Sequence, residues 1–214
     1  MLNWITTARP EPLQIPFSIW YILFAGLILL ASAYGAKLVA EHCAQRWNNN
    51  PAKANLICIG IMCAVTTASL IIFGISMTTL QASIYCGTCL FASYSDFKER
   101  KLDDCASCIV FVTALIGCTM TNVPAMAISG LVIGGVTLIT ATISGGKGIG
   151  GADIKFAAAS ATMLGLHRSC IGLIVGLLLA VIVNGIRDKR RGTKDGFPLI
   201  PYMAIGFVGA FFIP

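Results

Sequence analysis

Eight apolar segments, most of them close to the length that crosses a lipid bilayer, dominate this sequence. A helix needs roughly 20 mostly apolar residues to span the hydrocarbon core of a membrane. Such segments recur with short polar stretches between them, at about 17–37, 56–74, 78–95, 105–121, 124–143, 153–166, 169–186 and 197–213. The sequence therefore predicts an all-α fold, a polytopic integral membrane bundle of about eight transmembrane helices.

The composition leaves no room for a soluble domain of ordinary size. Of the 214 residues, 57% are hydrophobic and 11% are charged, whereas soluble domains carry about 25% charged residues. The first residues, MLNWITTARPEPLQIPF, lack the basic start, apolar core and cleavage site of a secretory signal. We therefore expect one membrane domain over 1–214, a first apolar segment that is kept, and no binding of nucleic acid.

The basic residues define the expected topology. If the segments alternate in direction, the loops at 38–55, 96–104, 144–152 and 187–196 share one side of the membrane. That side, with the adjoining helix ends, holds all fifteen Lys and Arg residues except Arg9 and Arg168. Cytoplasmic loops are enriched in Lys and Arg, so these four loops are predicted to be cytoplasmic and both termini external. A miscounted helix would scramble this split.

Two aspartates fall at the same predicted cytoplasmic boundary. Asp96 follows the third apolar segment, and Asp153 opens the sixth, directly after the glycine-rich stretch SGGKGIGG at 144–151. Ionisable groups at membrane depth are costly and often mark a functional site. Each aspartate would also be an ordinary helix-end acid, since a carboxylate in a first helical turn is favoured by the helix dipole. The residues alone leave both interpretations open.

If the two aspartates meet, their chemistry is that of an aspartic peptidase. Two adjacent carboxylates do not both ionise cheaply, so the pair shares one proton. The ionised partner takes a proton from a water that attacks a peptide carbonyl, and the protonated partner polarises that carbonyl and later protonates the leaving amine. Gly150 and Gly151 would let a substrate backbone approach closely, because no side chain stands in the way.

Cysteines give a second signal, which we interpret differently. Cys86 and Cys89, together with Cys105 and Cys108, have a spacing that occurs in zinc sites. A tetrahedral site needs its four ligands at one point, whereas these thiols are expected at different depths in the membrane. We predict that the protein needs no metal.

Three polar stretches keep two interpretations each. The basic run RDKRRGTKDG at 187–196 is typical of an anchor that attracts anionic lipid, or it could hold an acidic part of a substrate. The stretch KLVAEHCAQRW at 37–47 is either an amphipathic piece on the inner surface or a frayed helix end. Pro198 and Pro201 either shape a cleft or simply start the last helix.

Three stretches together resemble the type IV prepilin peptidases. DFKERKLDD, from Asp96, resembles the Asp-x5-Ile-Pro-Asn stretch of that family, and GGADIKFAAA, from Gly150, resembles its Gly-x-Gly-Asp-x-Lys stretch. DGFPLIPYMAIG, at 195–206, resembles the closing Pro-Phe-x-Pro-x-Leu-Ala-x-Gly segment. The matches fall in the family's order and on one predicted membrane side, and they cover the chain from about residue 78 to its end.

The resemblance implies an aspartic endopeptidase of the bacterial inner membrane that removes the cytoplasmic leader from prepilins or pilin-like secretion subunits, without a cofactor. It divides the chain into N-terminal helices 1 and 2 (1–77) and a peptidase core (78–214). Asp96 and Asp153 match the catalytic pair, and Lys155 matches a family lysine that either tunes the nearby carboxylate or lies near the interface. The residues expected to shape the substrate site are Gly150, Gly151, Ala152, Lys155, Pro198 and Pro201.

The sequence departs from the family pattern at three places. Ala152 stands where the second glycine of Gly-x-Gly-Asp is usual, so the local turn is expected to differ. Leu102-Asp103-Asp104 replaces Ile-Pro-Asn, which removes a rigid turn and adds charge. The 38–55 loop has one cysteine, Cys43, whereas longer members have two cysteine pairs linked to methylation. The chain thus resembles the short form that acts only as a peptidase.

Two other functions stay open from the sequence. A relative of signal-peptide peptidase would also use an aspartate pair and a Gly-x-Gly-Asp loop, but that group has Tyr directly before its first aspartate, and here Ser95 intervenes after Tyr94. A small proton- or cation-coupled transporter would be expected to have its acids in the middle of helices rather than at their ends.

Overall fold

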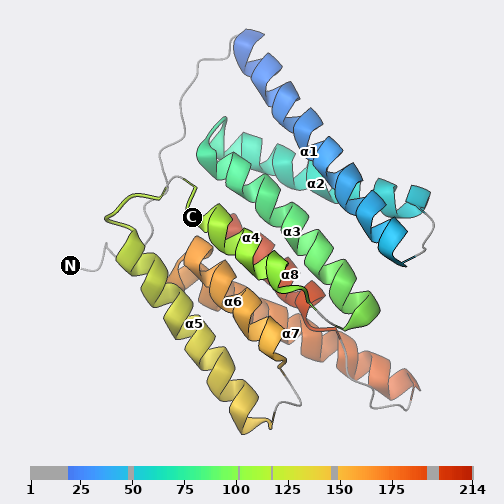
Figure 1. The fold of residues 1–214 in the computed structure, drawn as a ribbon, viewed down its shortest axis with the longest axis vertical. Helices are drawn as coiled ribbons and strands as arrows, with labels where there is room; N and C mark the ends of the chain where they lie inside the picture. Colours follow the sequence, from blue (N-terminus) through green and yellow to red (C-terminus); the bar gives the residue numbers. More distant parts are fainter. Residues whose placement is uncertain are drawn as a thin grey trace.

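The computed structural model describes residues 19–47, 51–100, 102–116, 118–145, 149–191 and 198–213. This part of the chain forms eight helices and no strand (Figure 1). The helices are α1 (Ile19–Trp47), α2 (Pro51–Phe73), α3 (Met77–Glu99), α4 (Asp104–Ala114), α5 (Val123–Ile143), α6 (Gly151–Leu164), α7 (Leu166–Arg191) and α8 (Ile200–Phe211). The predicted all-α class is confirmed.

Half of these helices have the dimensions of membrane spans. Among the described residues, α1, α2, α5 and α7 are long and apolar enough to cross a bilayer, so this is a helical membrane protein. By contrast, α4, α6 and α8 have 11, 14 and 12 residues. These lengths correspond to about 17 to 21 Å, less than the roughly 30 Å of hydrocarbon. Eight complete crossings therefore stay a prediction.

Two predicted boundaries are wrong. The first helix does not end near residue 37 but continues to Trp47, so the 37–47 stretch is neither a separate surface piece nor a frayed end. The fourth segment, predicted to reach residue 121, ends as a helix at Ala114. Polar residues close local turns after it: the Asn122 N–H donates to the Thr119 carbonyl over 2.9 Å. Such turns compete with the helix for backbone hydrogen bonds.

The short helices lie in the centre of the molecule, and long apolar helices lie around them (Figure 1). Phe156 of α6 and Phe207 of α8 are fully buried, and they pack in one core with Tyr85 of α3. The outer helices instead expose large aliphatic side chains, such as Leu30 and Leu131. An apolar exterior of this extent fits a protein whose solvent is lipid.

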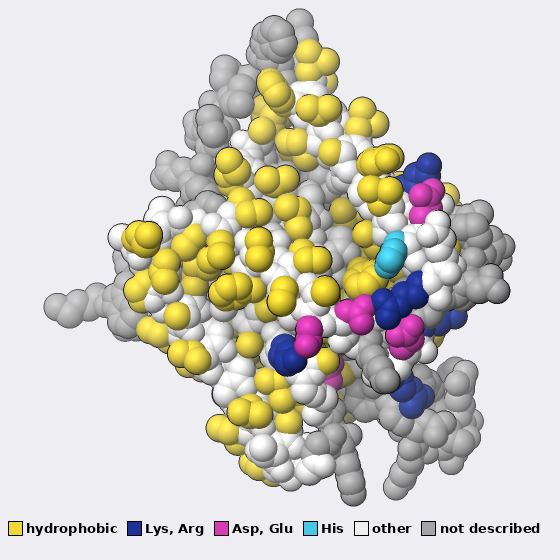
Figure 2. All heavy atoms as spheres, in the orientation of Figure 1, with side chains coloured by type: hydrophobic (Ala, Val, Ile, Leu, Met, Phe, Trp, Pro, Cys, Tyr) yellow, Lys and Arg dark blue, Asp and Glu magenta, His cyan; other side chains and the backbone are white. Residues whose placement is uncertain are grey.

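Charged side chains gather on one side of the face drawn in Figure 2, and hydrophobic side chains cover most of the rest. Several of these charges pair across helices. Arg46, near the end of α1, contacts Asp103 over 2.6 Å and Glu99 over 3.2 Å. Lys155 of α6 contacts Asp104 of α4 over 2.8 Å. The 38–55 and 96–104 loops and the start of α6 therefore share one side, as the charge pattern predicts.

Helices α7 and α8 pack with their backbones in contact, because three glycines face one another. Gly172 and Gly176 form a small-xxx-small pair on α7, a pattern that lets membrane helices approach closely. A Cβ atom placed on Gly206 of α8 would collide with the Gly172 carbonyl oxygen and lie 2.7 Å from the Gly176 nitrogen. This close crossing fixes where α8 lies and hence where its first turn ends up.

Candidate active site

Asp96 lies in the last turn of α3, three residues before the helix ends at Glu99. Its side chain is only 7% exposed. The carboxylate oxygen Oδ2 accepts a hydrogen bond of 3.0 Å from the N–H of Ile200, the first residue of α8. Backbone N–H groups in a first helical turn lack partners within their own helix, and the helix dipole favours a negative charge there. Asp96 thus supplies the cap that α8 lacks in its own N-cap residue, Leu199.

Pro198 and Pro201 flank this contact. Pro198 is buried, and Pro201 is the second residue of α8. Proline is well suited to a first helical turn, because its missing N–H would have no partner there. The prolines therefore do start the last helix, and the helix that they start contacts Asp96.

Asp153 is the third residue of α6, and its side chain is half-buried. Its Oδ2 accepts a hydrogen bond of 2.9 Å from the N–H of Gly150, the residue that caps the helix in an extended conformation. The preceding Ile149 is buried in the core and anchors the entry into α6. The side chain of Asp153 is thus oriented locally, because its carboxylate accepts a hydrogen bond from the start of its own helix.

The Asp153 carboxylate, in the first turn of α6, acts on the Asp96 carboxyl, in the last turn of α3, and both lie outside the long apolar spans. Burial raises the pKa of the Asp96 carboxyl to about 6, and the nearby Asp153 carboxylate adds to the rise, whereas the Ile200 N–H lowers this pKa. Burial also raises the pKa of Asp153, against the opposing effect of the Gly150 N–H. Two carboxyl groups brought together with raised pKa values can hold one proton between them near neutral pH.

The glycines beside Asp153 have two different roles. A Cβ on Gly150 would lie 3.3 Å from Asp153 Oδ2, so the Asp153 carboxylate leaves little room for a side chain at this position. Gly151 is exposed, and a Cβ there would meet no atom within 4 Å. Ala152 belongs to α6 itself, where alanine is favourable. Residues 146–148 of the glycine-rich stretch lie outside the described residues.

Comparison with known proteins agrees with this geometry. The family model of the type IV leader peptidase family matches residues 83–186, a range that contains both aspartates. Residues 83–186 of this chain belong to the type IV leader peptidase family. The chain is therefore an aspartic endopeptidase of prepilin peptidase type and a membrane protease. No curated protein and no solved structure matches it.

In this peptidase, Lys155 points away from the aspartates. Its Nζ lies 2.8 Å from Asp104 Oδ1, and both side chains are largely exposed. Lys155 follows Asp153 by two residues, which turns it by about 200° around the helix. The contacts favour a lysine near the interface over one that tunes the carboxylate. The departure at 102–104 thus has a structural use, because Asp103 and Asp104 tie the α3–α4 turn to α1 and α6.

The cysteine spacing of the peptidase does not correspond to a cluster in space. Cys86 and Cys89 are buried in α3, whereas Cys105 and Cys108 are exposed on α4. Among the described residues, no group of three or more potential metal ligands lies together.

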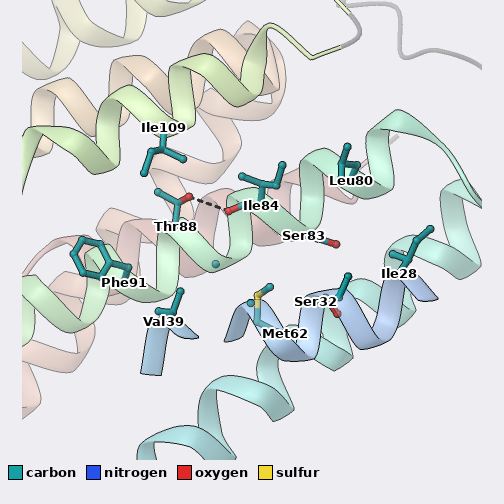
Figure 3. Close-up of a pocket in the computed structure, with 13 residues that line it drawn as sticks. Ile28, Ser32, Val39, Met62, Leu80, Ser83, Ile84, Thr88, Phe91 and Ile109 are labelled. Atoms are coloured by element: carbon teal, nitrogen blue, oxygen red, sulfur yellow. Dashed lines mark hydrogen bonds between the residues drawn. The ribbon is translucent and has the colours of Figure 1, made fainter. Parts of the chain in front are cut away.

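Two apolar cavities of the peptidase have neither Asp96 nor Asp153 among their lining residues. One, of about 390 Å³, is bounded by α1, α2, α3 and α4 and has Leu80 and Phe91 among its lining residues (Figure 3). Thr88, one of its polar residues, donates its hydroxyl to the Ile84 carbonyl of the same helix. Phe91 precedes Asp96 by five residues and therefore projects from the other side of α3. The second cavity, of about 800 Å³, lies between α4, α5 and α6 on the side of Lys155.

One feature of the site was not found from the sequence. The contact from Ile200 to Asp96 joins residues 104 positions apart and lies partly outside the family match. The only sequence signal for it was the resemblance of 195–206 to the family's closing segment.

Proposed function

We propose that this peptidase removes the cytoplasmic leader peptide from type IV prepilins or pilin-like secretion subunits, with Asp96 and Asp153 as its catalytic pair. Family membership implies cleavage of prepilin leader peptides. The observation that supports the assignment of residues is that these two carboxylates, at the ends of α3 and α6, lie close enough for the charge of Asp153 to raise the pKa of Asp96. Acids of a small transporter would be expected in mid-helix, whereas both of these lie in terminal turns.

The proposed reaction uses one proton shared by the pair. The ionised aspartate removes a proton from a water molecule as the water oxygen attacks the scissile carbonyl carbon. The protonated aspartate gives its proton to the carbonyl oxygen, which stabilises the tetrahedral intermediate. The C–N bond then breaks as the leaving nitrogen takes the proton that came from the water. One hydroxyl of the tetrahedral intermediate returns its proton to the other aspartate, so the products are a carboxylic acid and an amine, and the pair again holds one proton. Because the Oδ2 atoms are held by Ile200 and Gly150, the Oδ1 atoms are the ones that we expect to exchange protons.

The proposed substrate is a membrane-inserted precursor whose short basic leader lies in the cytoplasm. Its backbone would pass the open side of Gly151, where a Cβ would meet no atom of the described residues within 4 Å. We place the pair at the cytoplasmic face of the bacterial inner membrane. Within the chain, we assign helices 1 and 2 (1–77) to an N-terminal part and 78–214 to the peptidase core.

The direct test is co-expression of the peptidase with a candidate prepilin, followed by a gel assay for the shortened product. Asp96→Asn and Asp153→Asn are each expected to abolish cleavage, because an amide neither accepts the proton of the water nor donates a carboxyl proton. Asp104→Asn is the matched control, since Asp104 lies on the same side of the molecule but only pairs with Lys155. It is expected to cleave normally.

Membrane insertion of each variant is checked by fractionation. Complete processing by both inserted Asn variants would overturn the assignment of the catalytic pair.

A further inference from the structure

The orientation of Asp96 is set by a helix that does not carry it. Helix α3 fixes the position of the Asp96 backbone. The Asp96 carboxylate, however, accepts a hydrogen bond from the first N–H of α8. The family match ends at residue 186, so α8 (Ile200–Phe211) lies beyond the matched residues. Any residue that fixes the position of α8 therefore acts on the candidate catalytic pair from outside that range.

The position of α8 depends on Gly206. A Cβ at this residue would meet only backbone: the Gly172 oxygen, the Gly176 nitrogen at 2.7 Å and the Gly176 Cα at 3.0 Å. Backbone atoms in two packed helices have no rotamer through which to move aside, so any side chain at 206 must push the helices apart. Gly209 lies one turn further along α8, and a methyl group placed there would have nothing within 4 Å.

We infer that Gly206 is a positioning residue for the peptidase reaction, because it lets α8 approach α7 to the distance at which the Ile200 N–H holds Asp96. Gly206 does not touch the aspartates or the substrate. It acts through the first turn of α8, six residues or about 9 Å away along the helix axis. The inference rests on the proposed role of Asp96.

Loss of this contact has a consequence for pH dependence. A hydrogen bond to the charged form of a carboxyl lowers its pKa, and the backbone N–H groups of Ile200 and Leu199 have this effect on Asp96. The charge of Arg100 also lowers this pKa, whereas the Asp153 carboxylate raises it. If α8 moves away, the pKa of Asp96 rises. The acid limb of the activity profile, which reports the first ionisation of the aspartate pair, then moves to higher pH. A side chain that only supports the general stability of the fold would lower the amount of active enzyme without moving this limb.

The experiment compares Gly206→Ala with Gly209→Ala in the purified full-length peptidase, with kcat, KM and the pH profile measured on one precursor. Both changes have the same effect on helix propensity, so they differ only in the contact with α7. We expect Gly206→Ala to lower kcat by about tenfold or more, with a smaller change in KM, and to shift the acid limb upward. Gly209→Ala is expected to keep the pH profile and a kcat within about twofold of the parent.

A second pair of variants tests the hydrogen bond from the Ile200 N–H to Asp96 directly. If Gly206→Ala does not fold, this pair alone tests the inference. Ile200→Pro removes the N–H at the first helical position, where proline needs no donor, and it also disfavours the right-handed helical backbone of Leu199 before it. Ile200→Ala keeps the N–H and loses the buried side chain. We expect the proline variant alone to shift the acid limb upward.

A folded Gly206→Ala with the parent's kcat and pH profile, or an Ile200→Pro that leaves the acid limb unmoved, would overturn the inference. Inactive Asp96→Asn and Asp153→Asn variants beside such results would leave the proposed function standing. Active Asn variants would instead remove the proposed function itself.

Discussion

At the scale of single residues, the two aspartates are held in different ways. Asp153 is oriented by Gly150, three residues earlier in the chain, and this arrangement is part of the start of α6. Asp96 is oriented by Ile200, which lies 104 residues later in the chain, with helices α4 to α7 between them. Errors in the packing of distant helices should therefore disturb Asp96 before they disturb Asp153.

Gly151 offers a test of substrate approach that leaves the fold intact. It is the first residue of α6, it is exposed, and a Cβ there has open space around it. We expect Gly151→Ala and Gly151→Val to leave thermal stability nearly unchanged. If the precursor backbone passes this point, the larger side chain should raise KM, with kcat/KM falling by about tenfold for valine, which equals about 1.4 kcal/mol.

The matched control for this test is Gly60→Val, on α2, where a Cβ also has nothing within 4 Å. It should cleave with the parent's KM. A Gly151→Val enzyme with an unchanged KM would show that the substrate does not pass this glycine.

At the scale of helices, close packing is concentrated around the short central ones. A Cβ on Gly130 of α5 would lie 2.6 Å from the Cγ2 methyl of Thr162 on α6 and 3.4 Å from the Ala158 carbonyl oxygen. Helix α6 carries Asp153 and packs between α5 and the core. The Gly130 contact therefore helps to hold in place the helix that carries Asp153.

We predict that Gly130→Ala lowers the stability of the folded state by about 1 to 3 kcal/mol, the usual cost of overpacking. Thr162→Ser removes the clashing methyl and keeps the hydroxyl bond to the Ala159 carbonyl, so the double variant should recover most of the loss. Gly135→Ala, on the same helix with open space, is the control. The stability of Gly130→Ala, Thr162→Ser, the double variant and Gly135→Ala is measured by thermal unfolding in detergent. If the double variant is no more stable than Gly130→Ala, the contact with the Thr162 methyl does not determine the packing of α5 against α6.

Which helices could be predicted depended on whether their ends are determined locally. The start of α6 was predicted within two residues, because glycines followed by an acid mark a helix N-terminus. The end of α1 was missed by ten residues, since its last turns are polar and are held by the pairing of Arg46 with Asp103 and Glu99. The prediction from apolar content alone made α4 too long. The turn in which the Asn122 N–H donates to the Thr119 carbonyl does not change the hydropathy enough to mark the end of the helix.

The candidate site divides in the same way. Both aspartates and the glycines could be found from spacing and charge, since each belongs to a short local motif. The contact of Ile200 with Asp96 and the crossing at Gly206 could not, because they depend on how α7 and α8 pack. The local sequence thus predicts which chemical groups the site contains. The packing of the helices determines how the Asp96 carboxylate is oriented.

At the scale of the whole molecule, three contacts constrain the topology. Arg46 with Glu99, Asp104 with Lys155, and Asp96 with Ile200 each join two points that must lie on one side of the membrane. An even number of crossings therefore separates the two members of each pair. Because α2, α5 and α7 are each apolar enough to span, we infer that α3, α4 and α6, their partners in these pairs, also cross.

This topology predicts the side on which each loop lies, and reporter fusions test it. Alkaline phosphatase joined after Asn49 should be inactive, because the loop at 38–55 is expected in the cytoplasm, where the enzyme does not fold. The same reporter joined after Thr119, between α4 and α5, or after Pro214 should be active. Green fluorescent protein at the same three points is the complementary control and should fluoresce only after Asn49. An active phosphatase after Asn49 together with an inactive one after Thr119 would invert the topology and place the aspartate pair outside the cell, out of reach of a cytoplasmic leader.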